Sequence, residues 1–370
     1  MTSDFNCHET WDAVIIGAGP AGSITAALLA ERGWNVLLLE RKAWPREKAC
    51  GGCLNAVAIR LLRASGLGSA LEGATPIHRL EVRLGNRHLS VSTPPGLAID
   101  RKTFDGRLVE QAISRGAFFV DRAKATLLPR RSRSFREVSI EHDNRIAIVH
   151  APLVLACDGI QGSSLRDEAW AKWQTAENAA IGLSTTVTDD SIPAGTITMC
   201  VGSGGYVGLV RQGETTVHVG AALHLESCIS GGSPALLTQR ILIENGISLQ
   251  FNKKLTGIGP MTRQREVAGE GILAVGDACG YVEPFTGEGI AWAIRGACSL
   301  AHLLTQSGPA WTEDLALAWK TAYANEVARR QGWCKMLQAL TRMPTAAAAC
   351  MQLGKWFPSI PQRVAERIGG

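Results

Sequence analysis

Two cysteines separated by two residues are the most reactive pair of side chains in the sequence. They are Cys50 and Cys53, in the stretch REKACGGCLN (46–55). A Cys-x-x-Cys pair can supply half of a zinc site, form a redox-active disulfide, or place thiols beside a reactive group. No second Cys-x-x-Cys or His pair offers matching ligands, so we predict no metal site. The choice between the other two alternatives depends on what lies next to this loop.

A glycine-rich turn near the N-terminus indicates a dinucleotide site. Gly17, Gly19 and Gly22 form a Gly-x-Gly-x-x-Gly pattern that follows a short apolar run (12–16) and opens a stretch with helical periodicity. A second apolar run ends at Glu40. In such a unit the glycines allow a tight turn, close approach to a pyrophosphate and close helix packing, while the acid accepts hydrogen bonds from a ribose. The phosphates are expected at the N-terminus of the helix.

Three later segments must help to build the same site. APLVLACDGIQGSSLR is an apolar run leading to Asp158, and GILAVGDACGYVEPFTGEGI is a second run leading to Gly276 and Asp277. A helical stretch begins after it, from about Ile290. The third segment, DRKTFDGRLVEQAISRGA (100–117), lies between the glycine pattern and these runs.

Together these motifs resemble the glutathione-reductase-type FAD-binding fold of the p-hydroxybenzoate hydroxylase superfamily, and within it the geranylgeranyl reductase family. The likeness covers about the first 300 residues. It departs at Gly162, where the family commonly has Ser, and at Arg166, which comes one residue later than the family's Arg. The resemblance implies an α/β fold: a Rossmann-like FAD-binding domain with an inserted antiparallel β-sheet substrate domain and C-terminal helices. The implied FAD-binding domain is discontinuous (1–75, 100–165 and 265–310), the substrate domain takes 76–99 and 166–264, and 311–370 forms the helical segment.

The resemblance also assigns a cofactor site. Asp277 would hydrogen-bond the ribityl chain of FAD, and the loop from Pro284 to Gly289 would lie against the isoalloxazine ring. The helix that follows would point its positive end at the pyrimidine edge. Arg101 is similar to a cofactor-contacting arginine, with an ion pair to Asp105 as the alternative role. The expected FAD-binding residues are Gly17, Gly19, Pro20, Ala21, Gly22, Glu40, Arg41, Cys50, Gly51, Arg101, Asp158, Gly276, Asp277, Pro284, Gly287, Glu288, Gly289 and Ile290.

The same resemblance places the Cys-Gly-Gly loop at the catalytic face of the flavin. Cys50 matches the family's cysteine, and Cys53 replaces a small residue. The loop would then be a close wall of the active site, with Cys50 as a proton donor or a packing contact. A Cys50–Cys53 disulfide that passes electrons to the flavin is the alternative.

The stretch GGYVGLVRQGETTVHVGAAL (204–223) is typical of a β-hairpin in the substrate lobe. Prenyl reductases of the resembled family carry Tyr-x-Trp-x-Phe-Pro here, which lines a lipid pocket. This chain keeps Tyr206, a candidate pocket residue, but has Gly208, Val210 and Arg211 in place of Trp, Phe and Pro. Gly208 would widen the pocket, and Arg211 is either a turn residue or an anion contact. The departure weakens the case for a geranylgeranyl substrate.

Two flavoenzyme reactions fit these features. In the first, NADPH or NADH binds transiently, since no second glycine pattern is present, and the enzyme reduces a C=C bond in a lipophilic small molecule. In the second, a monooxygenase hydroxylates an aromatic or polyketide-like molecule. The Cys-Gly-Gly loop and PFTGEGI favour the reductase, while the altered pocket motif favours the monooxygenase. A halogenase would carry a Trp-x-Trp-x-Ile-Pro segment, which is absent from this sequence. A non-catalytic electron-transfer protein would have no pocket over the flavin, and the Cys-Gly-Gly loop and the substrate lobe argue against it.

Composition limits the remaining classes. The chain is 46% hydrophobic, and no apolar run is long enough to span a bilayer. The start MTSDFNCHET lacks a signal pattern, so we expect a cytoplasmic protein whose ten cysteines are mostly reduced. The densest basic cluster, PRRSRSFR (129–136), is interpreted as an exposed hairpin tip and not as a nucleic-acid site, because it holds a single aromatic residue, Phe135, and no series of aromatic residues between its arginines. Contact of the C-terminal tryptophans with a membrane surface is less favoured than core packing.

Overall fold

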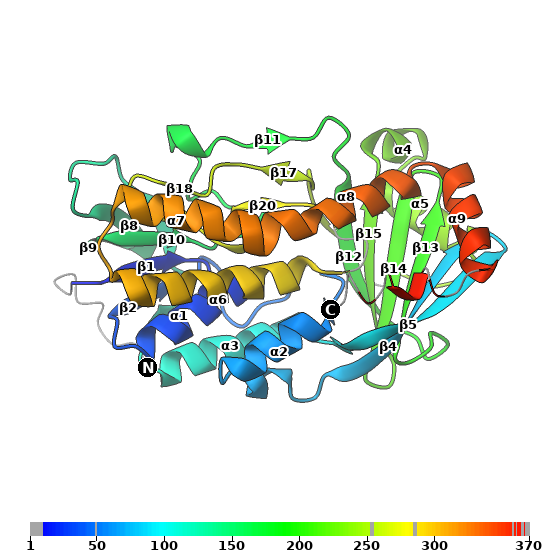
Figure 1. Cartoon of the computed structure of the whole chain (residues 1–370), viewed down its shortest axis with the longest axis horizontal. Helices are drawn as coiled ribbons and strands as arrows, with labels where there is room; N and C mark the ends of the chain where they lie inside the picture. Colours follow the sequence, from blue (N-terminus) through cyan, green and yellow to red (C-terminus); the bar gives the residue numbers. More distant parts are fainter. Residues whose placement is uncertain are drawn as a thin grey trace.

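The computed structural model describes residues 10–48, 50–251, 255–283, 287–356, 359, 361–363 and 366. They form an α/β fold around two large sheets, which Figure 1 shows side by side along the longest axis. The first sheet carries the glycine turn, and the second sheet contains the expected hairpin.

The first sheet is mostly parallel and wholly apolar. Its strands are β1 (Ala13–Ile16), β2 (Val36–Leu39), β6 (Phe118–Val120), β10 (Leu153–Ala156), β18 (Ala268–Gly269) and β19 (Ile272–Ala274), in the order β18-β19-β10-β1-β2-β6. The strand β1 pairs in parallel with β2 and with β10. Every residue of β1, β2 and β10 is buried, as expected for parallel strands covered on both faces.

Three helices and a small sheet provide this cover. The helices are α1 (Pro20–Ala30), α3 (Arg101–Ser114) and α6 (Gly289–Ser307), with α1 in contact with the other two. The small antiparallel sheet contains β7 (Lys124–Leu127), β8 (Arg136–His142) and β9 (Arg145–Ala151). Its inward side chains Val138, Ile140 and Val149 belong to the same apolar core as the first sheet.

The second sheet has eight strands and joins segments that are far apart in the sequence. They are β3 (Cys53–Leu54), β4 (Thr75–Leu84), β5 (Arg87–Ala98), β12 (Ile181–Thr188), β13 (Thr196–Gly202), β14 (Gly205–Gln212), β15 (Thr216–Leu223) and β16 (Thr256–Ile258). Their order is β16-β12-β15-β14-β13-β4-β5-β3. The predicted antiparallel arrangement holds for every pair except β13 and β4, which run parallel.

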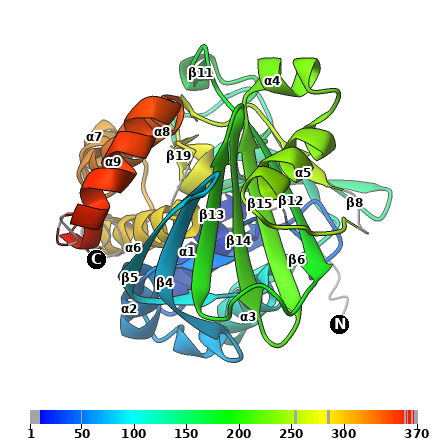
Figure 2. The same ribbon diagram turned by 90° about the vertical axis from the view of Figure 1, so that its right-hand side faces the viewer.

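Helices cover one face of this second sheet and leave the other face to the site. The helices α4 (Leu225–Ser230) and α5 (Pro234–Glu244) follow β15, and Figure 2 shows α5 across β14 and β15. The buried side of α5, including Leu237 and Ile241, packs against apolar residues of β14 and β15. The opposite face of this sheet faces the half of the molecule that contains the glycine turn.

The C-terminal part is helical, as predicted. The helix α7 (Glu313–Tyr323) passes through a π-helical turn (Ala324–Ala328) into α8 (Arg329–Thr341), and α9 (Pro344–Trp356) follows. Figure 1 shows α7 and α8 extending from the first sheet to the second. The remaining elements are α2 (Ala56–Ala64), a three-stranded sheet of β11 (Gln174–Thr175), β17 (Arg263–Gln264) and β20 (Gly280–Tyr281), and 3-10 turns at Gly68–Leu71, Ala169–Ala171 and Gly276–Ala278. Among the helices described, none has the length and apolar character needed to cross a membrane.

The interpretation of 129–136 as an exposed hairpin tip is wrong for its last residue. Arg136 begins β8 and its side chain is only 2% exposed. Its guanidinium forms an ion pair with Glu168 at 2.5 Å and donates to the carbonyl oxygens of Glu270 and Leu128. A buried arginine needs this number of acceptors, and they come from segments that only the folded chain brings together.

Candidate active site

The glycine turn between β1 and α1 has the geometry that a dinucleotide needs. Gly17 has a φ of +106°, and a Cβ there would lie 2.5 Å from the carbonyl oxygen of Cys157. A Cβ at Gly22 would lie 1.9 Å from the carbonyl oxygen of Gly17. Only glycine fits at either position, and the result is a tight turn that leaves the N-terminus of α1 open.

Glu40 lies at the end of β2, next to this turn. Its side chain is 4% exposed and forms an ion pair with Arg46 at 3.4 Å. It also accepts hydrogen bonds from the backbone N–H groups of Ala18 and Lys42. The carboxylate therefore stabilises the turn and remains part of a cavity wall.

Three adjoining cavities lead from this turn to the second sheet. We call them the outer, middle and apolar cavities. The outer cavity, of about 370 Å³, lies between the turn, Glu40 and the loop after β10. It shares Gly19, Lys48 and Cys157 with the middle cavity. The middle cavity in turn shares the Cys-Gly-Gly loop and Tyr281 with the apolar cavity.

The middle cavity has a cationic character beside the α1 N-terminus. It is lined by Lys48, Arg101 and Asp277. Arg101 makes a two-point ion pair with Asp105, 2.9 Å from Nε to Oδ1 and 2.6 Å from Nη2 to Oδ2. Burial lowers the pKa of Arg101, but Asp105 and Cys50 together raise it by more, so the net shift of this pKa is upward. Arg101 therefore forms the ion pair with Asp105 and also lines the cavity, and its contact with the cofactor stays a prediction.

Lys48 is a site residue that sequence reasoning missed. Its Nζ lies 3.6 Å from the positions that a Cβ would take at Gly19 and at Gly159. Burial and the nearby Arg101 charge lower the pKa of Lys48, and Asp277 partly offsets this. Burial has the opposite effect on the carboxyl group of Asp277 and raises its pKa, while the positive charges of Lys48 and Arg101 oppose this increase. No motif marked Lys48, and its closeness to Cys50 in the chain was the available signal.

The Cys-Gly-Gly loop is attached to the second sheet. The Cys50 N–H donates to Ser184 Oγ at 3.2 Å, and Cys53 pairs with Ala98 as part of β3. Gly52 has a φ of +67°, and a Cβ there would lie 2.9 Å from the Ile99 carbonyl oxygen and 3.2 Å from the His218 ring. These contacts hold the loop at the point where the middle and apolar cavities meet.

Both cysteines of this loop are free thiols in the structure. The Gly52 N–H donates to Cys50 Sγ, and Cys53 Sγ–H donates to the Gly51 carbonyl oxygen. Burial, together with the nearby Cys50, raises the pKa of Cys53 to about 12. Cys53 is therefore a neutral thiol near pH 7 and a poor nucleophile.

The described residues contain no cluster of His, Cys, Asp or Glu suited to a metal ion.

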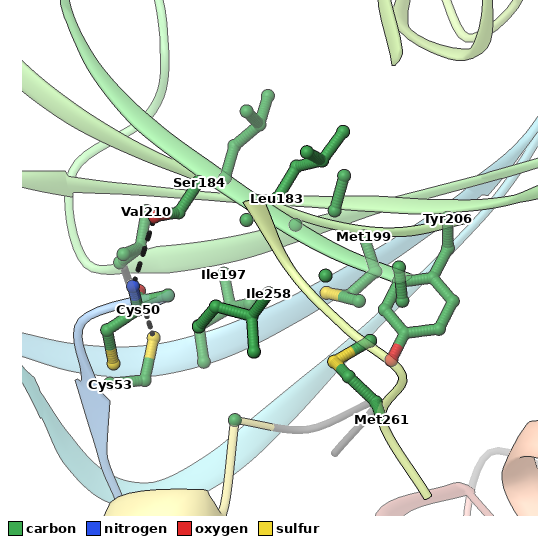
Figure 3. A pocket seen from close by; sticks show the side chains of 18 of the residues that line it. Cys50, Cys53, Leu183, Ser184, Ile197, Met199, Tyr206, Val210, Ile258 and Met261 are labelled. Carbon is green, nitrogen blue, oxygen red and sulfur yellow. Dashed lines mark hydrogen bonds between the residues drawn. The ribbon is translucent and has the colours of Figure 1, made fainter. Parts of the chain in front are cut away.

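The apolar cavity lies between the Cys-Gly-Gly loop and the open face of the second sheet (Figure 3). Figure 3 shows Ile197, Met199 and Ile258 between the two cysteines and Tyr206. Met199 Sδ lies 2.9 Å from the position of a Cβ at Gly208, so methionine fills the space that the absent side chain leaves.

Arg211 is the second-last residue of β14, so its interpretation as a turn residue is wrong, and it lies outside the lining of this cavity. Its guanidinium donates to the carbonyl oxygens of Asp190 and Glu214.

The structure brings most of the predicted FAD-binding residues to these cavities. Those lining the middle cavity are Gly19, Pro20, Ala21, Cys50, Gly51, Arg101, Asp277, Gly287, Gly289 and Ile290. Those lining the outer cavity are Gly17, Gly19, Glu40, Arg41 and Asp158. Pro284 lies outside the described residues.

Gly22, Gly276 and Glu288 line none of the three cavities. Gly276 has a φ of +66° and a Cβ there would lie 2.9 Å from the Ala21 side chain, so it permits close packing. Glu288 precedes α6 and accepts a hydrogen bond from Cys334 Sγ at 3.0 Å.

Asp158 stabilises its own loop. Its Oδ2 accepts a hydrogen bond from the Ser164 N–H at 2.9 Å, and burial raises its pKa.

Comparison with known proteins identifies the cofactor. Residues 10–207, more than half of the chain, match the family described as "FAD binding domain". The chain belongs to this FAD-binding family. The open glycine turn and the cations of the middle cavity fit a dinucleotide with two phosphates.

Similar proteins extend the identification. The menaquinone reductase of Mycobacterium tuberculosis is 28% identical over 362 residues, covering 91% of this chain and 85% of that protein. The digeranylgeranylglycerophospholipid reductase 2 of Methanothermobacter thermautotrophicus is 29% identical over 295 residues, covering 77% and 75%. The structure of a geranylgeranyl bacteriochlorophyll reductase-like protein from Thermoplasma acidophilum matches with a TM-score of 0.77 at 19% identity, covering 90% and 88%, which shows the shared fold. The protein is an FAD-dependent oxidoreductase, and it is similar to the two reductases named above.

Proposed function

We propose that this protein uses NADPH or NADH to reduce a C=C bond in a lipophilic small molecule. The observation that carries the proposal is the junction at the Cys-Gly-Gly loop, where the apolar cavity meets the middle cavity. FAD bound in the outer and middle cavities would supply a hydride. A lipophilic molecule in the apolar cavity would then lie next to the cofactor and away from water.

The roles of the cavity residues follow from their chemistry. The open N–H groups at the start of α1, together with Lys48 and Arg101, would bind the pyrophosphate. Glu40 would bind the ribose, and Asp277 the ribityl chain. Cys50 and Gly51 would form the wall between cofactor and substrate. Because Gly51 and Gly52 have no side chains, the backbone of this loop could approach both the cofactor and the substrate closely.

The substrate class is supported by the lining of the apolar cavity. Aliphatic and thioether side chains such as Ile197, Met199 and Val210 dominate it, and hydroxyl groups are supplied by Ser184 and Tyr206. Such a surface favours an apolar ligand with few polar groups. The names of the two reductases above are those of enzymes acting on menaquinone and on a digeranylgeranyl lipid, which agrees with a lipophilic alkene.

Anaerobic stopped-flow spectroscopy tests the proposal. Protein reduced by NADPH should be reoxidised by a prenyl alcohol or a prenylated naphthoquinone without oxygen, with one C=C bond lost per flavin oxidised. It should react slowly with oxygenated buffer. Fast reoxidation by oxygen through a transient absorbance, with no reaction with either alkene, would contradict the reductase and favour a monooxygenase.

A further inference from the structure

Two arginines and one tryptophan form a cationic cluster outside the three cavities, which we call the Arg–Trp cluster. Arg263 belongs to β17, and Arg265 follows two residues later. The guanidinium carbon of Arg263 lies 4.2 Å from the ring centroid of Trp173, and that of Arg265 lies 3.9 Å from it. Side chains two residues apart on an extended chain point to the same side, so both arginines reach the same indole ring.

The described residues around this cluster leave part of its hydrogen-bonding capacity unused. Arg265 is 7% exposed, and its Nε donates to the Ala278 carbonyl oxygen at 2.6 Å. Its Nη2 and the Nε of Arg263 are buried without a hydrogen-bond partner among the described residues. The acid next in sequence, Glu266, forms an ion pair with Lys320 at 2.8 Å instead. Buried donors of a charged group without acceptors cost free energy, which a bound anion would recover.

The two arginines also repel each other. Burial alone lowers the pKa of Arg263. Burial lowers the pKa of Arg265 to about 10, the charge of Arg263 adds to this shift, and Asp158 and Cys279 oppose it. Both guanidinium groups stay protonated near pH 7, so the cluster holds two neighbouring positive charges. An anion with more than one negative charge would remove the repulsion.

The cluster lies next to the cavities that we expect to hold FAD. Figure 1 shows β17 between β11 and β20, and Arg263 lies directly opposite Tyr281 of β20. Tyr281 lines the middle and apolar cavities. On the other side, Ala278 accepts the hydrogen bond of Arg265 and directly follows Asp277 of the middle cavity. A ligand held by the cluster would therefore be one strand away from the middle cavity.

A phosphate monoester matches this cluster in charge and in shape. It carries about two negative charges near pH 7 and has three strong acceptor oxygens. Guanidinium groups bind such oxygens in pairs, and stacking on an indole ring orders them beforehand. NADPH differs from NADH by one group of this kind, the 2′-phosphate of its adenosine ribose, which an arginine accommodates in other dinucleotide sites.

We propose that Arg263 and Arg265, stacked on Trp173, form a phosphate site that binds the 2′-phosphate of NADPH. The inference rests on the proposed function and names its electron donor. A phosphate could also be carried by the substrate, but none of the three residues lines the apolar cavity. Contact with the turn of Asp277 places the cluster on the cofactor side. The site makes the enzyme prefer NADPH over NADH.

Binding of adenosine phosphates tests the site without turnover. In isothermal titration, the FAD-loaded wild-type protein should bind adenosine 2′,5′-bisphosphate at least about tenfold more tightly than adenosine 5′-monophosphate, the gain expected from one charge-assisted hydrogen bond or more. Arg263→Met should lose this difference. Arg145→Met is the matched control, since Arg145 is an exposed arginine on β9. Equal affinity of the wild type for the two nucleotides would overturn the proposal.

Anaerobic reduction of the flavin tests whether the site selects the donor. The wild type should reach half of its maximal reduction rate at a lower concentration of NADPH than of NADH. In Arg263→Met this preference should fall about tenfold to a hundredfold, the value of one or two charge-assisted hydrogen bonds. Arg263→Lys keeps the charge and should retain more of the preference. An equal loss with NADPH and NADH would contradict the assignment to the 2′-phosphate.

The outcomes separate this inference from the proposed function. If Arg263→Met instead slows reoxidation by a prenyl diphosphate and not by a prenyl alcohol, the phosphate belongs to the substrate and the assignment to NADPH is wrong. If NADPH and NADH reduce the wild type equally well, the phosphate site is wrong and the reductase stands. If neither nucleotide reduces the wild type, the proposed function fails, and the titration with the bisphosphate decides the phosphate site independently.

Discussion

Lys48 shows how a single residue can prepare the site for an anionic cofactor. Its ammonium group lies beside the backbone of Gly19 and Gly159, in a cavity that also contains Arg101. Without an anion, burial and the arginine charge lower the pKa of Lys48. A pyrophosphate in the cavity would stabilise the protonated amine, so binding of FAD should be coupled to uptake of a proton.

Replacing Lys48 should therefore lower the affinity for FAD and reduce the dependence of that affinity on pH. In Lys48→Met the affinity should fall about tenfold to a hundredfold, the value of one or two charge-assisted hydrogen bonds. In the wild type, affinity should fall as the pH rises through the lowered pKa of Lys48, and in the variant this dependence should be reduced. Isothermal titration of the apoprotein with FAD measures both effects. Lys102→Met, which removes an exposed lysine, is the control, and equal losses in the two variants would contradict the assignment.

At the scale of elements, the Cys-Gly-Gly loop depends on β3 and on its contacts with the second sheet. Gly52 lies between Ile99 and His218, and Cys50 is bonded to Ser184 of β12. The helix α8 has a similar role on the other side of the junction. Its residues Cys334 and Gln338, one turn apart, hydrogen-bond Glu288 and Glu283 and so connect α8 to the start of α6 and the end of β20.

Gly52→Ala should destabilise the protein, whereas Gly51→Ala should not. At Gly52 a Cβ meets backbone and ring atoms and the φ is positive, so we expect a loss of about 1–3 kcal/mol in the free energy of unfolding. At Gly51 a Cβ meets nothing within 4 Å. Urea unfolding of the two apoproteins measures the difference. Equal stabilities would mean that the loop is not held as the structure shows.

At the scale of the whole molecule, the site exists because two sheets are joined. The first sheet supplies the glycine turn and Asp277, and the second supplies the apolar cavity. Buried contacts between distant segments hold the FAD-binding half together. The ion pair of Arg136 with Glu168 is one of them, since it connects the small sheet to the segment after β10.

Removing this ion pair should destabilise the FAD-binding half. Arg136→Met leaves Glu168 without its buried partner, and we expect a cost of about 3–5 kcal/mol. Arg133→Met changes an exposed arginine of the same cluster and should have almost no effect. Thermal and urea unfolding compare the two variants. A small effect at both positions would indicate that Arg136 is solvated, as the sequence had suggested.

The sequence by itself determined the parts that depend on neighbouring residues. The glycine turn of a dinucleotide site, the acid at the end of β2 and the hairpin of β14 and β15 follow from local spacing, because sterics and hydrogen bonding within a few residues decide them. FAD as the dinucleotide was implied by the resemblance of several motifs to a known family. Only the tertiary structure decided the contacts between distant segments. They include Lys48 beside Gly159, Glu283 beside Tyr206, the parallel pairing of β13 with β4, and the burial of Arg136. The physical reason is that desolvation and long-range hydrogen bonds depend on which segments meet, and local sequence patterns do not contain that information.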